Sequence, residues 1–176
     1  MSAVESPCPG IVTRAATADD IARIARHRRL MFEEMRLASG AALEQVERDT
    51  QAALTHAMIE GCYRHWFAED AGRVIAGAGV IVARWLPMPQ EPALMRATVL
   101  NVYTERSHRR RGIARQLMQV VIAWCRGAGF AMVQLHASDD GRPLYESLGF
   151  RPTNEMRLLL DEAAGGRGRV DVRPPT

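Results

Sequence analysis

The residues best suited to chemistry in this 176-residue chain are three consecutive arginines followed by small residues. Arg109-Arg110-Arg111 leads directly into Gly112-Ile113-Ala114. A guanidinium presents its N–H donors in a rigid fork that matches phosphate oxygens. Gly112 lacks a Cβ, so a ligand can approach the backbone closely, and Ala114 leaves its position almost as open. This segment therefore predicts a site for a phosphate or pyrophosphate group.

A strand and a helix must position these residues. The preceding run is rich in β-branched and aromatic residues, which predicts a strand up to about Glu105. Its expected faces alternate, with Leu100, Val102 and Thr104 on one side and Asn101, Tyr103 and Glu105 on the other. The following run has an apolar stripe at helical spacing, formed by Ile113, Leu117, Val120, Val121 and Trp124, and the polar positions Arg115, Gln116, Gln119 and Arg126 fall elsewhere. The first turn of such a helix attracts anions through its unpaired N–H groups and its dipole.

Two segments carry a family resemblance. The pattern Arg109-x-x-Gly112-x-Ala114 after a strand resembles the acetyl-CoA signature Q/R-x-x-G-x-G/A of the GNAT superfamily of N-acetyltransferases. The segment from Gly141 to Phe150, GRPLYESLGF, resembles the family's late A-x-x-L-Y-E-x-x-G-F block. In element order the resemblance extends from about Ile11 to Leu160. It implies an α/β (α+β) fold with a mixed, mostly antiparallel central sheet, helices on both faces and a splayed pair of parallel strands.

The resemblance also implies a chemistry, in which acetyl-CoA is the co-substrate and an amine attacks it directly in a ternary complex. The implied cofactor-binding residues are Val102, Tyr103, Thr104, Arg109, Arg110, Arg111, Gly112, Ile113, Ala114, Arg115 and Ser138. Ser138 stands where many relatives have an asparagine. Tyr145 occupies the position of the tyrosine that protonates the departing thiolate, and an ordinary phenol pKa of about 10 lies above that of a thiol, about 8.5.

The acceptor and the general base are less well defined. In the family the first helical pair forms one wall of the acceptor site, which makes Glu33, Glu34 and Arg36 candidates, although ordinary solvated charges would look the same. The acceptor is expected to be a small-molecule or peptide primary amine. Spacing assigns no base, and the candidates are Glu33, Glu34, Glu91, Glu105, His136 and a water relay.

The remaining chain predicts one acetyltransferase domain over residues 11–161, between a flexible leader (1–10) and a disordered tail (162–176). A capping box at Thr17 to Asp20 starts a helix that ends near Gly40, with Ile21, Ile24, Met31 and Met35 inward and the His27-Arg28-Arg29 cluster at least partly outward. The other expected elements are strands Ile11–Ala15, Tyr63–Glu69, Val74–Trp85, Phe130–Ala137 and Phe150–Leu160, a helix Ala42–Ile59 and a short helix from Pro143 to Gly149. The turn residues Asp70-Ala71-Gly72 predict a hairpin between the second and third of these strands.

Composition narrows the functional classes. The net charge is only +3 with 20 acidic residues, which is not typical of a dedicated nucleic-acid binder. Cys8, Cys62 and Cys125 contain no close pair, so no metal site is expected, and Cys125 falls on the core side of its helix as a buried, inert thiol. No run approaches the roughly 20 apolar residues of a membrane span, and we expect a cytoplasmic protein.

Two other functions stay open at this point. One is a non-catalytic acyl-CoA-binding regulatory module. The other is a nucleic-acid-binding protein that uses the arginine run together with Arg167, Arg169 and Arg173. Dimers are common in the family, so the resemblance also makes a homodimer a candidate assembly.

Overall fold

The computed structural model describes residue 8, residues 10–87, residue 89 and residues 94–158. In these ranges the strands form one sheet in the order β1-β2-β3-β4-β5. The strands are β1 (Ile11–Ala15), β2 (Tyr63–Asp70), β3 (Arg73–Arg84), β4 (Met95–Thr104) and β5 (Val133–Leu135). Neighbours from β1 to β4 pair antiparallel, and β5 runs parallel to β4. The mixed, mostly antiparallel sheet expected from the sequence is confirmed.

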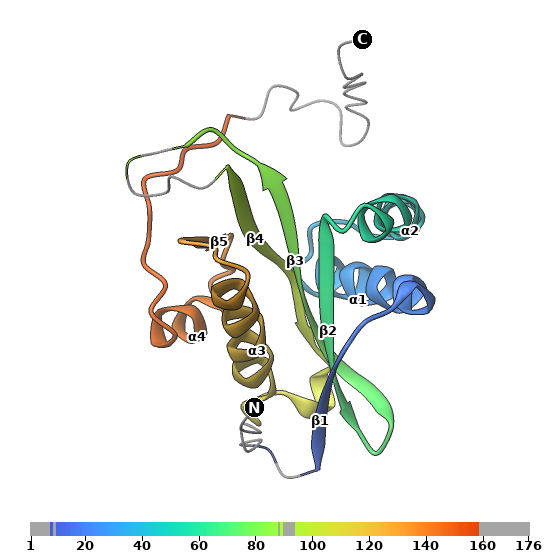
Figure 1. Ribbon diagram of the computed structural model, residues 1–176. Coiled ribbons are helices and arrows are strands. Elements are labelled where there is room, and N and C mark those ends of the chain that lie inside the picture. Colours follow the sequence, from blue (N-terminus) through green and yellow to red (C-terminus); the bar gives the residue numbers. More distant parts are fainter. Residues whose placement is uncertain (1–7, 9, 88, 90–93, 159–176) are drawn as a thin grey trace.

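Helices cover both faces of this sheet (Figure 1). One face carries α1 (Ile21–Glu34) and α2 (Ala41–Ile59), and the other carries α3 (Ile113–Gly127) and α4 (Arg142–Ser147). Each face has its own apolar cluster. On the α3 side, Ile113 and Leu117 of the predicted stripe are fully buried. On the α1 side, Ile24 and Leu54 pack with Phe67 of β2. Burial of these stripes holds the helices on the sheet.

The hairpin between β2 and β3 forms where the turn residues predicted it. Asp70 pairs with Arg73, and the two residues between them, Ala71 and Gly72, have φ of +48° and +78°. Two consecutive positive φ angles are typical of the tight turns whose twist matches that of the flanking strands. This turn brings Asp70 to the end of the sheet where β4 runs into α3.

Three helix predictions need correction. α1 ends at Glu34 and not near Gly40, because Arg36 takes a left-handed φ of +56° that breaks the helix. Met35, predicted inward, is 44% exposed. His27, predicted at least partly outward, is buried, and burial lowers its pKa to about 4. Its ring is therefore a neutral part of the core.

The end of the chain also differs from the prediction. β5 covers only Val133–Leu135 of the strand predicted over Phe130–Ala137. Residues 150–158 form none of the predicted last strand. Pro152 has no N–H to donate to a ladder, and Met156 and Leu158 are 94% and 80% exposed, so no apolar face is buried here. Residues 159–160, the predicted tail and most of the predicted leader lie outside the described residues.

The predicted capping box is present and lies within a group of ion pairs. The Asp20 carboxylate accepts a hydrogen bond from the Thr17 N–H at 3.0 Å. It also pairs with Arg14 at 2.7 Å and Arg23 at 3.0 Å, although the residue is only 6% exposed. Hydrogen bonding to Arg14, above all, lowers the pKa of Asp20 to about 2. The ionised form is thus favoured by folding.

We expect Asp20→Asn to lower the free energy of unfolding at pH 7 by about 1–3 kcal/mol, because it removes a buried carboxylate that is hydrogen-bonded to Arg14 and Arg23. The folded-state pKa lies below the ordinary 3.8. The carboxylate therefore stabilises the fold above about pH 4, and this contribution is lost as pH falls through about 2. Urea unfolding between pH 2 and 7 measures both effects. Asp19→Asn, at an exposed neighbour, is the control, and equal pH dependence in both variants would contradict the prediction.

Candidate active site

β4 contains a bulge in its second half. Opposite Ala78 of β3 stand two β4 residues, Asn101 and Val102, and Asn101 has a φ of +56°. Leu100 and Asn101 therefore face the α1 side together, whereas Val102 packs into the cluster under α3. The strict alternation predicted for this strand is wrong at Leu100. A bulge of this kind re-aims side chains and backbone groups.

β4 and β5 separate just where the bulge begins. Their pairing ends with Val99 opposite Leu135, where β5 stops, while β4 continues to Thr104. Pairing with β3 continues on the other side of β4 as far as Thr104. We call residues 100–104 the open edge of β4, because no described strand pairs with them on the β5 side. The predicted splay is confirmed, and Val102, Tyr103 and Thr104 lie on this edge, where unpaired backbone groups can accept an extended ligand.

The open edge leads into the arginine turn, residues 109–115. Arg110 and Gly112 have φ of +62° and +80°. The N–H groups of residues 110–115 donate to no acceptor within the described part of the chain. The N-terminus of α3 adds the positive end of a helix dipole, and buried Ile113 anchors its first turn, with Ala114 half-buried beside it. A turn with these N–H groups can cradle an anion.

Two of the three arginine side chains of this turn form ion pairs within the protein. The Arg109 guanidinium turns back to the carboxylate of Glu34. Arg111 lies 3.7 Å from Asp70 of the β2–β3 turn. Among the three, Arg110 alone has no ion pair or hydrogen bond to the described residues. The backbone and Arg110 are thus the groups directly available to a phosphate, while Arg109 and Arg111 brace the turn.

Glu34, at the end of α1, connects the arginine turn to the opposite face of the sheet. One carboxylate oxygen accepts hydrogen bonds from the Tyr103 hydroxyl and Arg106 Nε, each at 3.1 Å, and the other pairs with Arg109. Burial alone would raise the pKa of Glu34, but these donors lower it below its ordinary value. A carboxylate held ionised by three donors is poorly suited to accept a proton. Glu34 thus holds the side chains of Tyr103, Arg106 and Arg109 in place.

A cavity lies beside the bulge, between α1, α2 and the sheet. The other residues predicted to contact the acceptor or to act as the base do not line it. Glu33 and Arg36 are exposed, Glu105 forms an ion pair with Arg73 at 3.2 Å, and His136 lies 3.3 Å from exposed Glu155. Glu91 lies outside the described residues.

That cavity, of about 360 Å³, lies between α1, α2 and the sheet, and we call it the α1–α2 cavity. The sheet contributes Tyr63, Ile81, Leu100 and Asn101, and α1 contributes Arg28 and Phe32. The α2 lining is Val46, Asp49, Thr50, Ala53, Leu54 and Ala57. The cavity is mostly apolar, contacts the β4 bulge directly, and has the size of a small-molecule site.

A chain of hydrogen bonds crosses the sheet side of this cavity. Arg28 Nη1 donates to Asn101 Oδ1 at 2.5 Å, and Asn101 Nδ2 donates to the Tyr63 hydroxyl at 3.0 Å. That hydroxyl is 2.9 Å from His65 Nδ1. Burial lowers the pKa of His65 to about 3 and raises the pKa of Tyr63 to about 12, so both are neutral near pH 7. The only formal charge in the chain of bonds is that of Arg28.

Arg28 belongs to the His27-Arg28-Arg29 cluster, which was predicted at least partly outward and not as part of the site. The signal was nevertheless present, because Arg28 follows Ile24 by four residues and precedes Met31 by three. It therefore lies on the inward stripe of α1. Because charged side chains are usually exposed, Arg28 was expected at the surface, but it is half-buried in the structure.

Tyr145 lies in α4, on the same side of the sheet as Val102. Its ring packs edge-on against Phe150 with centroids 5.9 Å apart, and burial raises the pKa of its phenol. The hydroxyl has no hydrogen-bond partner among the residues the structure describes. Ser138 is close by, and its hydroxyl accepts the Gly141 N–H at 3.2 Å where α4 begins. Tyr145 thus presents a neutral, available O–H on the α3 side of β4.

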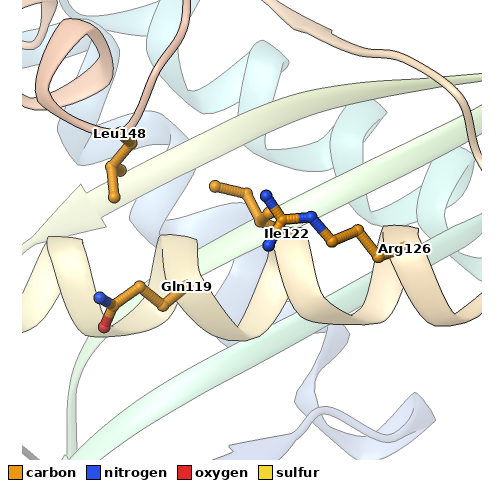
Figure 2. Close-up of a pocket in the computed structure, with 4 residues that line it drawn as sticks. All are labelled: Gln119, Ile122, Arg126 and Leu148. Carbon is orange, nitrogen blue, oxygen red and sulfur yellow. The ribbon is translucent and has the colours of Figure 1, made fainter.

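A second cavity, of about 310 Å³, lies between α3 and the end of α4 (Figure 2). Gln119, Ile122 and Arg126 of α3 face Leu148 across it. It includes none of the predicted site residues. Within the described residues, no group of histidine, cysteine, aspartate and glutamate could hold a metal ion, and none of the helices could cross a membrane.

Over residues 24–150 the chain matches the family model described as the acetyltransferase (GNAT) family. A GCN5-related N-acetyltransferase from Ralstonia eutropha JMP134 superposes with a TM-score of 0.81 and 34% identity, covering 86% of this chain and 99% of that one. A predicted acetyltransferase from Clostridium acetobutylicum, solved with acetyl-CoA, superposes with a TM-score of 0.80 and 20% identity, covering 89% of this chain and 99% of that one.

Human N-acetyltransferase 8 is 30% identical over 95 residues, which is 51% of this chain and 39% of the human protein. The chain thus matches well under half of that relative's length. The family model, in contrast, spans α3, the arginine turn, the open edge of β4 and α4, which are the parts on which the site is built. The chain therefore belongs to the GNAT family of acetyltransferases.

Proposed function

We propose that this protein is an N-acetyltransferase that moves an acetyl group from acetyl-CoA to a primary amine in a ternary complex. The observation that carries the proposal is the open edge of β4, residues 100–104, which runs directly into the arginine turn. Unpaired strand groups followed by the N–H groups of a helix start suit an extended arm that ends in a pyrophosphate. The acetyl-CoA bound to the Clostridium acetobutylicum neighbour supports the same co-substrate here.

Acetyl-CoA would supply an activated thioester, and the chain would bind and orient it. The N–H groups of the arginine turn, with Arg110, would hold the pyrophosphate. The backbone of Val102 to Thr104 would hold the pantetheine arm, and an N–H at the bulge would stabilise charge developing on the thioester oxygen. Cys125 would form no acyl-enzyme, because it is fully buried and burial raises the pKa of its thiol to about 11.

The amine would reach the bulge from the α1–α2 cavity, and Tyr145 would act from the α3 side. The raised pKa of Tyr145 keeps its phenol protonated, so it can give a proton to the departing thiolate. None of the candidate bases named from the sequence lines the cavity, and the carboxylate that does, Asp49, is exposed and accepts a hydrogen bond from Gln45. The amine would therefore be taken in its neutral form and would lose its proton to water, and the nearby charge of Arg28 disfavours the ammonium form.

Calorimetric titration and a thiol-release assay test this proposal together. We expect acetyl-CoA to bind more tightly than an unrelated nucleotide at moderate salt, with 3′-dephospho-CoA as a second comparison, and a primary amine to trigger release of the CoA thiol. Selective binding without thiol release from a broad amine panel would favour a non-catalytic acyl-CoA-binding module. Equal, strongly salt-dependent binding of every polyanion would indicate a generic basic patch.

A further inference from the structure

The α1–α2 cavity contains one cationic side chain among its lining residues, Arg28. Its recorded contacts are one hydrogen bond, from Nη1 to Asn101 Oδ1 at 2.5 Å, and stacking of the guanidinium over the Phe32 ring at 4.5 Å. A guanidinium carries five N–H donors. The remaining N–H donors of this half-buried charge have no protein acceptor among the described residues, so Arg28 is available to pair with an anion in a mostly apolar cavity.

The acidic residue in the same cavity does not neutralise Arg28. Asp49 is exposed and accepts a hydrogen bond from Gln45 at 2.8 Å, and it forms no ion pair with Arg28. Neighbouring arginines on α1 do have carboxylate partners, since Arg29 lies 3.7 Å from Glu47 and Arg23 pairs with Asp20. Arg28 thus lies in the cavity without an ion-pair partner among the described residues, whereas Arg23 and Arg29 of the same helix each have one.

The location of Arg28 restricts what the anion can be. Asn101, to which it is bonded, belongs to the β4 bulge, where the amine would meet the thioester. An anionic group bound by Arg28 would therefore lie within a few bonds of the reacting nitrogen. The rest of the wall is mainly apolar and includes Leu54, Ile81 and Leu100. A molecule with adjacent amine and carboxylate groups and an apolar body matches all three features.

We infer that the acceptor is a free α-amino acid with an apolar side chain, whose carboxylate pairs with Arg28 while its amine faces the β4 bulge. This inference rests on the proposed function and assigns its acceptor. In the reaction the amine nitrogen forms a bond to the acetyl carbon and the carbon–sulfur bond breaks. The sulfur takes a proton from Tyr145, which is reprotonated by water, and the amine loses one proton to water.

The test compares four amines that share the leucine side chain: L-leucine, L-leucinamide, 3-methylbutylamine and the dipeptide Leu-Gly. The rate of thiol release gives kcat/KM for each amine. Each value is divided by the fraction of the amine that is neutral at the assay pH, so that differences in amine pKa do not affect the comparison. The same series is then measured with the phenylalanine analogues. We expect the corrected kcat/KM of the free amino acid to exceed that of the amide and of the decarboxylated amine by about 10- to 100-fold, the effect of one charged hydrogen-bonded pair. The dipeptide separates a free amino acid from a peptide N-terminus.

The variants separate recognition from a structural role. Arg28→Met should abolish the preference for the carboxylate by raising KM for leucine, and Arg28→Lys, which keeps the charge, should restore part of it. Arg26→Met, at an exposed position of the same helix, is the matched control and should keep the preference, with thermal unfolding checked for each. A preference for Leu-Gly, no preference in the wild type, or an equal loss for all amines in Arg28→Met would overturn this inference alone. Thiol release from none of these amines but from other primary amines would also overturn this inference alone, whereas release from no amine of a broad panel would overturn the proposed function and this inference with it.

Discussion

Replacing Gly112 with valine is expected to weaken acetyl-CoA binding by about 100-fold. Gly112 has a φ of +80°, which a β-branched residue adopts only at a cost of about 1–2 kcal/mol. Relief of that strain would rotate the peptide units of the arginine turn and misdirect the N–H groups proposed to hold the pyrophosphate. Each charge-assisted hydrogen bond lost adds about 1.5–3 kcal/mol, and 1.4 kcal/mol corresponds to a factor of ten in affinity.

Gly129 provides a matched control for this variant. It has nearly the same φ, +81°, but lies beyond the far end of α3, and a Cβ there would meet no atom within 4 Å. Gly129→Val should therefore cost a similar strain and lower the melting temperature without changing acetyl-CoA affinity. Calorimetric titration of both variants measures the difference. Equal affinity of Gly112→Val and the wild type would show that the turn is not the pyrophosphate cradle.

Removal of the Tyr145 hydroxyl, in Tyr145→Phe, is expected to lower kcat by about 100-fold or more, the range typical of a lost general acid. Acetyl-CoA affinity and stability should change little, because the ring and its packing on Phe150 are retained and the hydroxyl makes no hydrogen bond to the described chain. Because burial raises the pKa of the Tyr145 phenol, the wild type should lose activity only at a pH above the ordinary range of tyrosine titration. The variant should lack that alkaline decrease.

Tyr103→Phe makes the same chemical change at a different position. The Tyr103 hydroxyl donates to Glu34, so its loss should act through the arginine turn and raise the KM for acetyl-CoA more than it lowers kcat. Steady-state kinetics across pH 6–11 would compare the two variants. Unchanged turnover in Tyr145→Phe, or an alkaline decrease that persists in it, would remove the assignment of Tyr145 as the acid.

The local elements were predictable because they depend on neighbours in sequence. The apolar spacing of Ile113 and Leu117 indicated α3, and Asp70 to Gly72 indicated the hairpin turn, since helix periodicity and turn conformation are encoded over a few residues. The same holds for the arginine turn, where Gly112 allows the left-handed conformation and the following helix supplies N–H groups. Together with the second family block, these features were enough to indicate the fold.

Only the tertiary structure decided how the side chains of the site are used. Arg28 and Asn101 are 73 residues apart, and Arg109 and Glu34 are 75 apart, yet each pair is in contact. Periodicity cannot show that Arg109 turns away from the phosphate cradle, or that a bulge places Leu100 and Asn101 on one face, because both depend on what the facing strand and helix offer. The chain by itself determined where acetyl-CoA is expected to bind. Packing of α1 on β4 determined which charge reaches the acceptor cavity, because only the folded chain brings that charge close to the bulge.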